Sequence, residues 1–134
     1  MEPLYTAEAL SVGDARNGQA YLADRSIDLK MSVPKEMGGA GDGANPEQLF
    51  ALGYAACFHS ALKLVAGKAK ADTTDSAVGA RVSIGSNDNG GFQLVVVLEV
   101  SIPNVSLDQA QELADAAHQV CPYSNATRSN IDVQ

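Results

Sequence analysis

The two cysteines are the residues of this chain most able to do chemistry. Cys57 lies in an apolar segment that begins near Leu49, and Cys121 directly precedes Pro122. The chain has no other thiol, so any intramolecular sulfur chemistry must use this pair. Two cysteines this far apart in the sequence can form a structural disulfide, remain as two inert core thiols, or act as a redox couple.

The local sequence gives Cys57 space but no charge. On a helix, its neighbours one turn away include Gly53 and Ala61, which leave room beside the sulfur for a small substrate or for another part of the chain. No cation lies one turn away, and a cysteine in the middle of a helix gains nothing from the N-terminal dipole. A reactive thiolate at Cys57 therefore needs a cation from elsewhere in the fold, and a buried inert thiol stays an alternative.

Cys121 is predicted to lie in the last turn of its helix, where exposed carbonyl groups disfavour a negative charge. This position suits a thiol that resolves an intermediate better than one that attacks a substrate. A role as an ordinary core residue remains open as well.

The histidines near the two cysteines raise two further possibilities. Cys57 and His59 do not share a helix face, so only His118 and Cys121 are spaced to bind one ion, and two ligands make no structural zinc site. We therefore expect no metal. A cysteine hydrolase with His118 as the base remains an alternative to a redox couple.

Length and composition favour one domain over residues 1–134, large enough to bury a core without a disulfide. The N-terminal region contains Glu2, Glu8 and Asp14 and no long apolar run, so we expect no signal peptide and a cytoplasmic protein. In that compartment thiols are kept reduced, and a disulfide is more often transient and catalytic than structural.

The charge pattern argues against nucleic acid and membranes as partners. The net charge is −7, the 9 basic residues are scattered, and there is no tryptophan. The longest apolar stretch, from Leu49 to Phe58, falls short of the roughly 20 residues that a membrane helix needs.

A long helix is expected to begin at Asn45-Pro46, because a capping residue is followed by proline at the first helical position. It should run to about Ala66, with Gly67 as its C-cap. The helix is apolar on nearly every side between Leu49 and Phe58, and a small domain has limited means to surround such a helix. We therefore expect a homodimer.

The remaining elements predict an α+β fold, with helices packed on largely antiparallel sheet. Ser106 and Gln109 match a capping box at the start of a second helix, which Pro122 ends. The expected strands are Leu4 to Ala9, Gln19 to Leu22, Ile27 to Val33, a hairpin of Ala80 to Ile84 with Phe92 to Ile102, and a last strand from Ile131 to Val133.

Several segments resemble the organic hydroperoxide resistance proteins of the OsmC/Ohr superfamily, in register over essentially the whole chain. The segments that carry the resemblance are Leu4 to Ala7, Pro34 to Gly39, Asn45 to Phe50, Gly53 to Phe58, Ala117 to Arg128 and Asn130-Ile131. The resemblance implies an OsmC-like intertwined homodimer, with largely antiparallel sheets packed around a long buried helix. It also implies a thiol peroxidase that reduces organic hydroperoxides to alcohols, uses no cofactor, and is re-reduced by a lipoylated dithiol.

The same resemblance assigns roles to four residues. It makes Cys57 the peroxidatic residue, Cys121 the resolving residue, Arg16 the cation that activates Cys57, and Glu47 the carboxylate that holds Arg16. Three positions depart from the family pattern: Ala15 and Ser129 stand where glycine is commoner, and Ala44 stands where threonine is usual.

Because the spacing before the matched arginine varies in the family, Arg25 and Arg128 are the alternatives to Arg16. Glu47 and Cys57 should be roughly 15 Å apart along one helix, too far for one small site. We therefore predict an obligate homodimer with composite sites, in which Cys57 and Cys121 of one chain meet Glu47 and Arg16 of the other.

Overall fold

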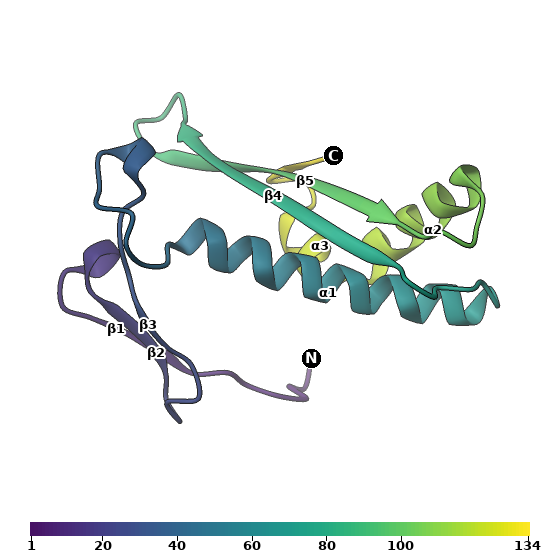
Figure 1. Ribbon diagram of the computed structural model, residues 1–134, viewed down its shortest axis with the longest axis horizontal. Coiled ribbons are helices and arrows are strands. Elements are labelled where there is room, and N and C mark those ends of the chain that lie inside the picture. The colour runs from purple at the N-terminus through teal and green to yellow at the C-terminus, as the bar shows by residue number, and fades with distance from the viewer. The chain divides into compact units, whose positions relative to one another are not determined.

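The computed structural model describes residues 1–134 as two compact units (Figure 1), an N-terminal unit, Met1–Leu49, and a C-terminal unit, Phe50–Gln134. The N-terminal unit holds one three-stranded sheet, and the C-terminal unit holds a second three-stranded sheet and nearly all of the helical residues. The predicted α+β class is confirmed. The prediction of a single domain stays a prediction.

The sheet of the N-terminal unit is antiparallel, in the order β1-β2-β3. Its strands and 3-10 helices are β1 (Ala9–Val12), η1 (Ala15–Asn17), β2 (Gln19–Leu22), β3 (Asp28–Lys30) and η2 (Lys35–Met37). The strand predicted from Leu4 to Ala9 was placed too early, because pairing with β2 begins at the turn, with Val12 opposite Gln19. Leu4 and Tyr5 stay exposed and join no strand.

The long helix α1 (Pro46–Lys68) begins where the sequence predicts. Asn45 Oδ1 accepts a hydrogen bond from the backbone N–H of Gln48, and Gln48 Oε1 accepts one from the backbone N–H of Asn45. This reciprocal capping box fixes the start of the helix.

The predicted end of α1 was wrong by two positions, because Gly67 lies inside the helix. Lys70 instead takes the left-handed conformation (φ 57°) that closes the helix. The Lys70 N–H bonds to Gly67 O and the Ala71 N–H to Ala66 O, which is the hydrogen-bond pattern of a Schellman motif. Lysine can fill this position, although glycine does so at lower cost.

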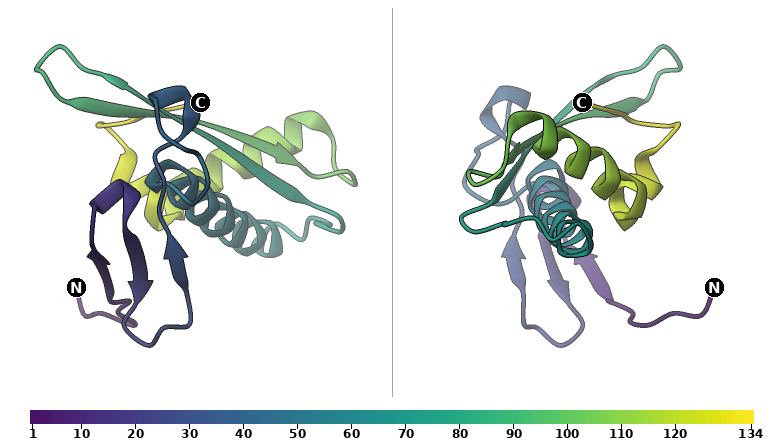
Figure 2. Two further views of the ribbon diagram at one scale, coloured as in Figure 1. Left: turned by 60° about the vertical axis from the view of Figure 1, so that its left-hand side comes forward. Right: turned by 90° about the vertical axis from the view of Figure 1, so that its right-hand side faces the viewer.

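The C-terminal unit is built on a long antiparallel hairpin, whose turn projects away from the helices in both views of Figure 2. Its further elements are β4 (Ala77–Ser86), β5 (Phe92–Ser101), α2 (Leu107–Val120), α3 (Pro122–Thr127) and β6 (Asp132–Val133). β5 is the central strand of this sheet, between β4 and β6, and β6 pairs with it in parallel. Ser106 caps α2, because its side chain accepts a hydrogen bond from the Gln109 N–H.

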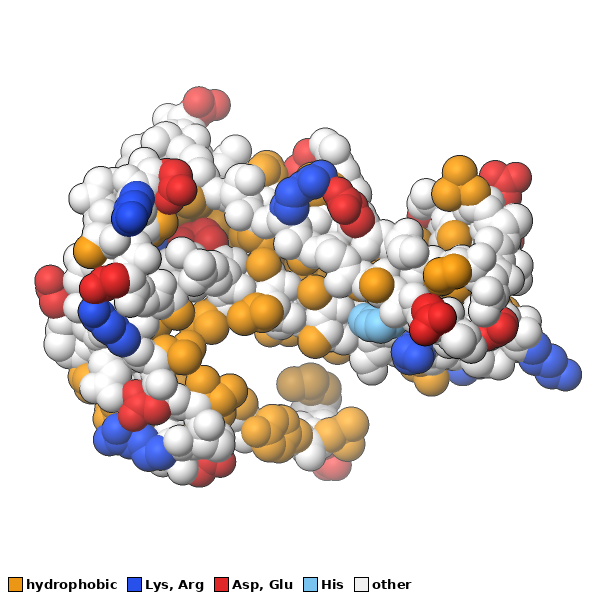
Figure 3. Space-filling model, in the orientation of Figure 1, with side chains coloured by type: hydrophobic (Ala, Val, Ile, Leu, Met, Phe, Trp, Pro, Cys, Tyr) orange, Lys and Arg blue, Asp and Glu red, His pale blue; other side chains and the backbone are white.

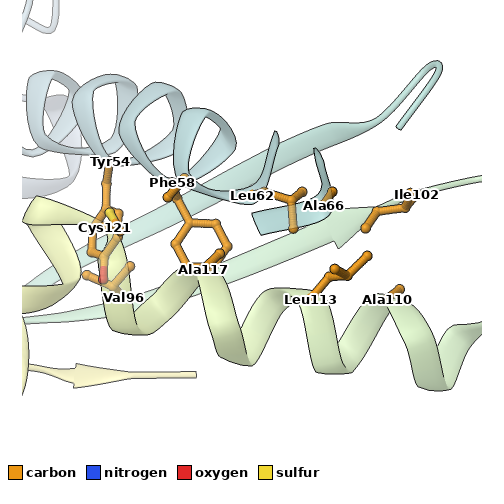
Figure 4. Packing of buried hydrophobic residues seen from close by; sticks show 11 residues of the cluster. Tyr54, Phe58, Leu62, Ala66, Val96, Ile102, Ala110, Leu113, Ala117 and Cys121 are labelled. Atoms are coloured by element: carbon orange, nitrogen blue, oxygen red, sulfur yellow. The ribbon is translucent and has the colours of Figure 1, made fainter. Parts of the chain in front are cut away.

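The core of the C-terminal unit lies between α1, α2 and β5. Figure 4 shows Phe58 and Leu62 of α1 facing Ala117 and Leu113 of α2. Leu62 and Ala117 are fully buried. By length and mean hydropathy alone, α1 is one helix that could cross a membrane. Its side that carries Phe58 and Leu62 packs into the core of the C-terminal unit, as a core helix does.

The opposite side of α1 is apolar and uncovered. Leu52 is 69% exposed and Leu64 is 56% exposed, and Figure 3 shows apolar side chains gathered along this helix. The sequence predicts a helix that is buried all round, whereas the C-terminal unit covers only one side of it. An exposed apolar surface of this kind is typical of an interface with another protein chain.

Helix α3 was not predicted, because Pro122 was interpreted only as the end of α2. Proline at the first position of a helix loses no hydrogen bond, so the same residue also starts α3. Ser129, which follows α3, has a φ of 65°. Ala15 has a φ of 47°, so both departures from the family's glycine pattern lie in left-handed backbone.

Replacing Ser129 by glycine should therefore stabilise the fold. Ser129→Gly should raise the free energy of unfolding by about 1 kcal/mol, because the left-handed conformation strains any residue that has a Cβ atom. Ser83→Gly, in the regular strand β4, is the matched control and should lower the free energy of unfolding by about 0.5–1 kcal/mol. Urea unfolding measures both, and a loss of stability at both positions would contradict the prediction.

Candidate active site

The two sulfur atoms of the chain lie in direct contact. The Sγ atoms of Cys57 and Cys121 are 3.6 Å apart, and both thiols are free. A disulfide bond is about 2.05 Å long, so a small movement suffices to join them. The expectation that the two sulfurs come together within one chain is confirmed.

Cys121 reaches this position because the chain changes direction there. It is the C-cap of α2 and the N-cap of α3, with extended backbone angles of φ −65° and ψ 124°. A residue that precedes proline disfavours the helical conformation, so Pro122 enforces this break. Cys121 therefore lies just beyond the helix rather than in its last turn as predicted, and its side chain is fully buried.

The environment of Cys57 disfavours its thiolate. Burial of the thiol raises the pKa of Cys57, and the neighbouring Cys121 raises it further, while a hydrogen bond from the backbone of Tyr123 lowers it. None of these groups is a cation. The structure thus agrees with the expectation that a reactive thiolate at Cys57 needs a positive charge brought from elsewhere.

The space beside Cys57 is filled by an aromatic side chain that sequence reasoning missed. A Cβ atom on Gly53 would lie 2.5 Å from the Oη of Tyr123, so only glycine lets this ring approach α1. Tyr123 packs at an angle against Phe50 and Tyr54, with ring centroids 5.8 and 5.6 Å away. The missing side chain at Gly53 was the available signal, but it did not identify what would fill the space.

Arg16 and Glu47 form a two-pronged ion pair within the N-terminal unit. The Arg16 guanidinium donates to both carboxylate oxygens of Glu47, over 2.9 and 2.8 Å. This hydrogen bonding holds the pKa of Glu47 below its usual value. Planar bidentate pairs of this kind fix the direction of the guanidinium as well as its charge.

The two alternative arginines are engaged in other contacts. Arg25 lies 3.6 Å from the centre of the Tyr21 ring and pairs with Asp28. Arg128 donates to Asn125 Oδ1 and to the backbone oxygen of His118. None of the three arginines, Arg16 included, hydrogen-bonds to a cysteine in the single chain, so the choice of Arg16 as the activating cation stays a prediction.

Neither histidine hydrogen-bonds to a sulfur atom. His118 Nδ1 lies 2.8 Å from Ser124 Oγ, and His59 Nε2 lies 2.9 Å from Ser76 Oγ. Burial and the charge of Arg128 lower the pKa of His118. No group of three or more His, Cys, Asp or Glu side chains could hold a metal ion.

Comparison with known proteins gives consistent results. The sequence model of the family described as OsmC-like protein matches residues 39–134. The organic hydroperoxide resistance protein of Xanthomonas axonopodis pv. citri is 52% identical over 132 residues, which cover 97% of this chain and 92% of that protein.

Solved structures agree with this relationship. The organic hydroperoxide resistance protein of Elizabethkingia anophelis superposes with a TM-score of 0.94 at 51% identity, covering 99% of this chain and 95% of that one. OhrB of Bacillus subtilis superposes with a TM-score of 0.90 at 42% identity, covering 98% and 97%.

The ion pair between Arg16 and Glu47 should make stability depend on pH. Because the pKa of Glu47 is lowered in the folded chain, the pair stabilises the fold above the usual glutamate pKa of about 4.3 and stops doing so as the pH falls through the lowered value. At pH 7, Glu47→Gln should cost about 1 kcal/mol, and the cost should vanish in acid.

Glu99→Gln is the matched control for this measurement, since Glu99 pairs with Arg81 while both side chains are more than 60% exposed. It should change stability by a few tenths of a kcal/mol or less at any pH. Chemical unfolding of both variants between pH 3 and pH 8, a range that spans the glutamate pKa, measures the difference. A Glu47→Gln cost that is independent of pH would show that the ion pair contributes nothing.

Proposed function

Since the chain belongs to the OsmC-like family, and within it to the organic hydroperoxide resistance proteins, we propose that it is a cysteine peroxidase that reduces organic hydroperoxides to alcohols. Its role is resistance to organic peroxide stress. The single observation that carries the proposal is the 3.6 Å contact between the only two thiols of the chain.

In the proposed reaction the Cys57 thiolate attacks the outer oxygen of the hydroperoxide. The O–O bond breaks, the leaving alkoxide takes a proton to become the alcohol, and Cys57 becomes a sulfenic acid. Cys121 then attacks the Cys57 sulfur, so that an S–S bond forms, the S–O bond breaks and water leaves. A dithiol reduces the disulfide by exchange and is itself oxidised.

The first step needs a cation, since burial and Cys121 together raise the pKa of Cys57. Arg16 is our choice, because its guanidinium is already oriented by Glu47. Beside the sulfur it would stabilise the thiolate and donate hydrogen bonds to the peroxide oxygens. A lysine would supply charge without the two-pronged geometry.

The four residues belong to one site if two chains combine. α1 is unbroken between Glu47 and Cys57, which separates them by roughly 15 Å along the helix axis. The exposed apolar side of α1, including Leu52 and Leu64, supplies a surface for a second copy. We therefore propose an obligate homodimer, in which Arg16 and Glu47 of one chain serve Cys57 and Cys121 of the other.

The reaction balances without a metal or an organic cofactor, because the peroxide is the oxidant and a dithiol is the reductant. A lipoylated protein is our choice of reductant, and the cytoplasm is our choice of compartment. Both rest on the family relationship, and the cytoplasm also fits a cysteine pair that is reduced between turnovers.

Mixing the reduced protein with one equivalent of an organic hydroperoxide should consume both thiols and release the alcohol. Cys57→Ser should abolish turnover, whereas Cys121→Ser should form a sulfenic acid that a nucleophilic trap detects, but turn over poorly with a dithiol. Thiol counting and product analysis measure this. Unchanged thiols would refute the proposal and leave two inert core cysteines, and ester hydrolysis without thiol loss would point to a hydrolase.

Subunit mixing tests the composite site. Cys57→Ser and Arg16→Ala homodimers should each be inactive or nearly so, whereas their heterodimer should contain one complete site. Equimolar random mixing should then restore about a quarter of wild-type activity, because half of the dimers carry one site of two.

The control pair for subunit mixing is Cys57→Ser with Cys121→Ser. In the composite arrangement both sulfurs come from the same chain, so this heterodimer gains no complete site. Recovery in the control but not with Arg16→Ala would contradict the arrangement, as would a fully active monomer.

A further inference from the structure

A chain of buried hydroxyl groups runs beside the two cysteines. The phenol oxygen of Tyr54 lies 2.8 Å from Ser124 Oγ and 3.2 Å from Thr127 Oγ1, and Ser124 Oγ lies 2.8 Å from His118 Nδ1. Tyr54, Ser124 and Thr127 are each at most 1% exposed. The proposed chemistry gives none of these residues a role.

This network joins the three helices that position the sulfurs. Tyr54 lies on α1 one turn before Cys57, and His118 lies on α2 one turn before Cys121. Ser124 lies on α3 one turn after Cys121. The hydrogen bonds therefore connect both sides of the bend at Cys121 to the helix that carries Cys57.

Pro122 breaks the helix at Cys121, and the packing of Tyr123 and the hydrogen bond from Arg128 to the His118 backbone oxygen help to hold the bend. The side-chain hydrogen bonds between α3 and α1, however, all belong to the buried network. α3 spans only Pro122–Thr127, and a helix this short is not stable by itself. Tyr54 joins α1 to α3 through its hydrogen bonds with Ser124 and Thr127. His118 joins α2 to α3 through its hydrogen bond with Ser124. No buried side-chain oxygen or nitrogen lacks a partner, and a fully satisfied buried network defines a single arrangement.

We propose that the hydrogen-bonded chain of Tyr54, Ser124 and His118 is a positioning device, which holds the Cys121 sulfur against Cys57 so that the disulfide closes before a second peroxide reacts. The proposal rests on the proposed peroxidase function. A misplacement of about 1 Å can slow a reaction between positioned groups by about 100-fold.

The outcome at risk is irreversible oxidation of Cys57. After the first step, the sulfenic acid is either attacked by Cys121, which releases water, or attacks a second hydroperoxide as its sulfenate, which yields a sulfinic acid and a second alcohol. The first product is reducible by a dithiol, and the second is not. Faster closure therefore protects the enzyme when peroxide is abundant.

The equilibrium of the Cys57–Cys121 disulfide with a glutathione buffer tests positioning without any peroxide. Tyr54→Phe and Ser124→Ala should each lower the equilibrium constant for disulfide formation about tenfold, because the thiol of Cys121 is less well placed. The double variant should lose less than the product of the two single effects, since both substitutions remove the Tyr54–Ser124 hydrogen bond, while each also removes one bond of its own.

Ser76→Ala is the matched control, because it removes a hydrogen bond of similar length from His59, also on α1, without touching α3. Its equilibrium constant should stay unchanged. An equal fall in the control would mean that general loosening is the cause. An equilibrium constant that stays unchanged in both Tyr54→Phe and Ser124→Ala would also overturn the proposal. Should Tyr54→Phe fail to fold, the result for Ser124→Ala decides by itself.

A second measurement connects positioning to the peroxidase reaction. With excess cumene hydroperoxide, Tyr54→Phe and Ser124→Ala should accumulate sulfinic acid at Cys57 about tenfold faster than the wild type, while the first step keeps its rate. Mass spectrometry and stopped-flow thiol loss measure these quantities, and equal rates of sulfinic acid formation in variants and wild type would overturn the proposal. If the wild type itself does not react, the proposed function fails, whereas the glutathione equilibrium still decides the positioning role.

Discussion

Contact between the half-buried Cys57 and the fully buried Cys121 is the constraint on which the rest of this structure depends. Contact between the sulfurs makes disulfide closure easy, since the Sγ atoms are only 3.6 Å apart. The same contact and burial raise the pKa of Cys57 and so oppose the thiolate with which the proposed reaction begins. The proposed reaction therefore needs a cation from outside the cysteine pair. In our proposal Arg16 supplies that charge, and its two hydrogen bonds to Glu47 fix the direction of the guanidinium.

α1 links these two requirements. Its first turn carries Glu47, its middle carries Cys57, and its length keeps the two apart. One side of the helix packs into the core of the C-terminal unit, and the other exposes Leu52 and Leu64. A helix with two apolar sides in a small chain is explained best by a second copy that covers the exposed side. The distance between Glu47 and Cys57 along α1 leads to the same proposal of a homodimer.

Local signals in the sequence predicted several elements well. Asn45-Pro46 and Ser106 start helices because each can cap free backbone N–H groups, a property of the residues themselves. The first strand was misplaced because an apolar run near Leu4 does not reveal whether a partner strand exists. α3 was missed because Pro122 ends one helix and starts another, and the sequence marks both events with the same residue.

The sequence by itself determined the number of thiols, the starts of both long helices, the hairpin, and the lack of a cation next to Cys57 on its own helix. Resemblance to a family supplied the roles that we propose for Cys57, Cys121, Arg16 and Glu47. Only the tertiary structure decided that the sulfurs touch, that Tyr123 fills the space left by Gly53, and that buried hydroxyl groups join three helices at the cysteines. Helix periodicity defines which face a residue occupies, whereas contacts between distant segments depend on how the helices pack, which no local pattern encodes.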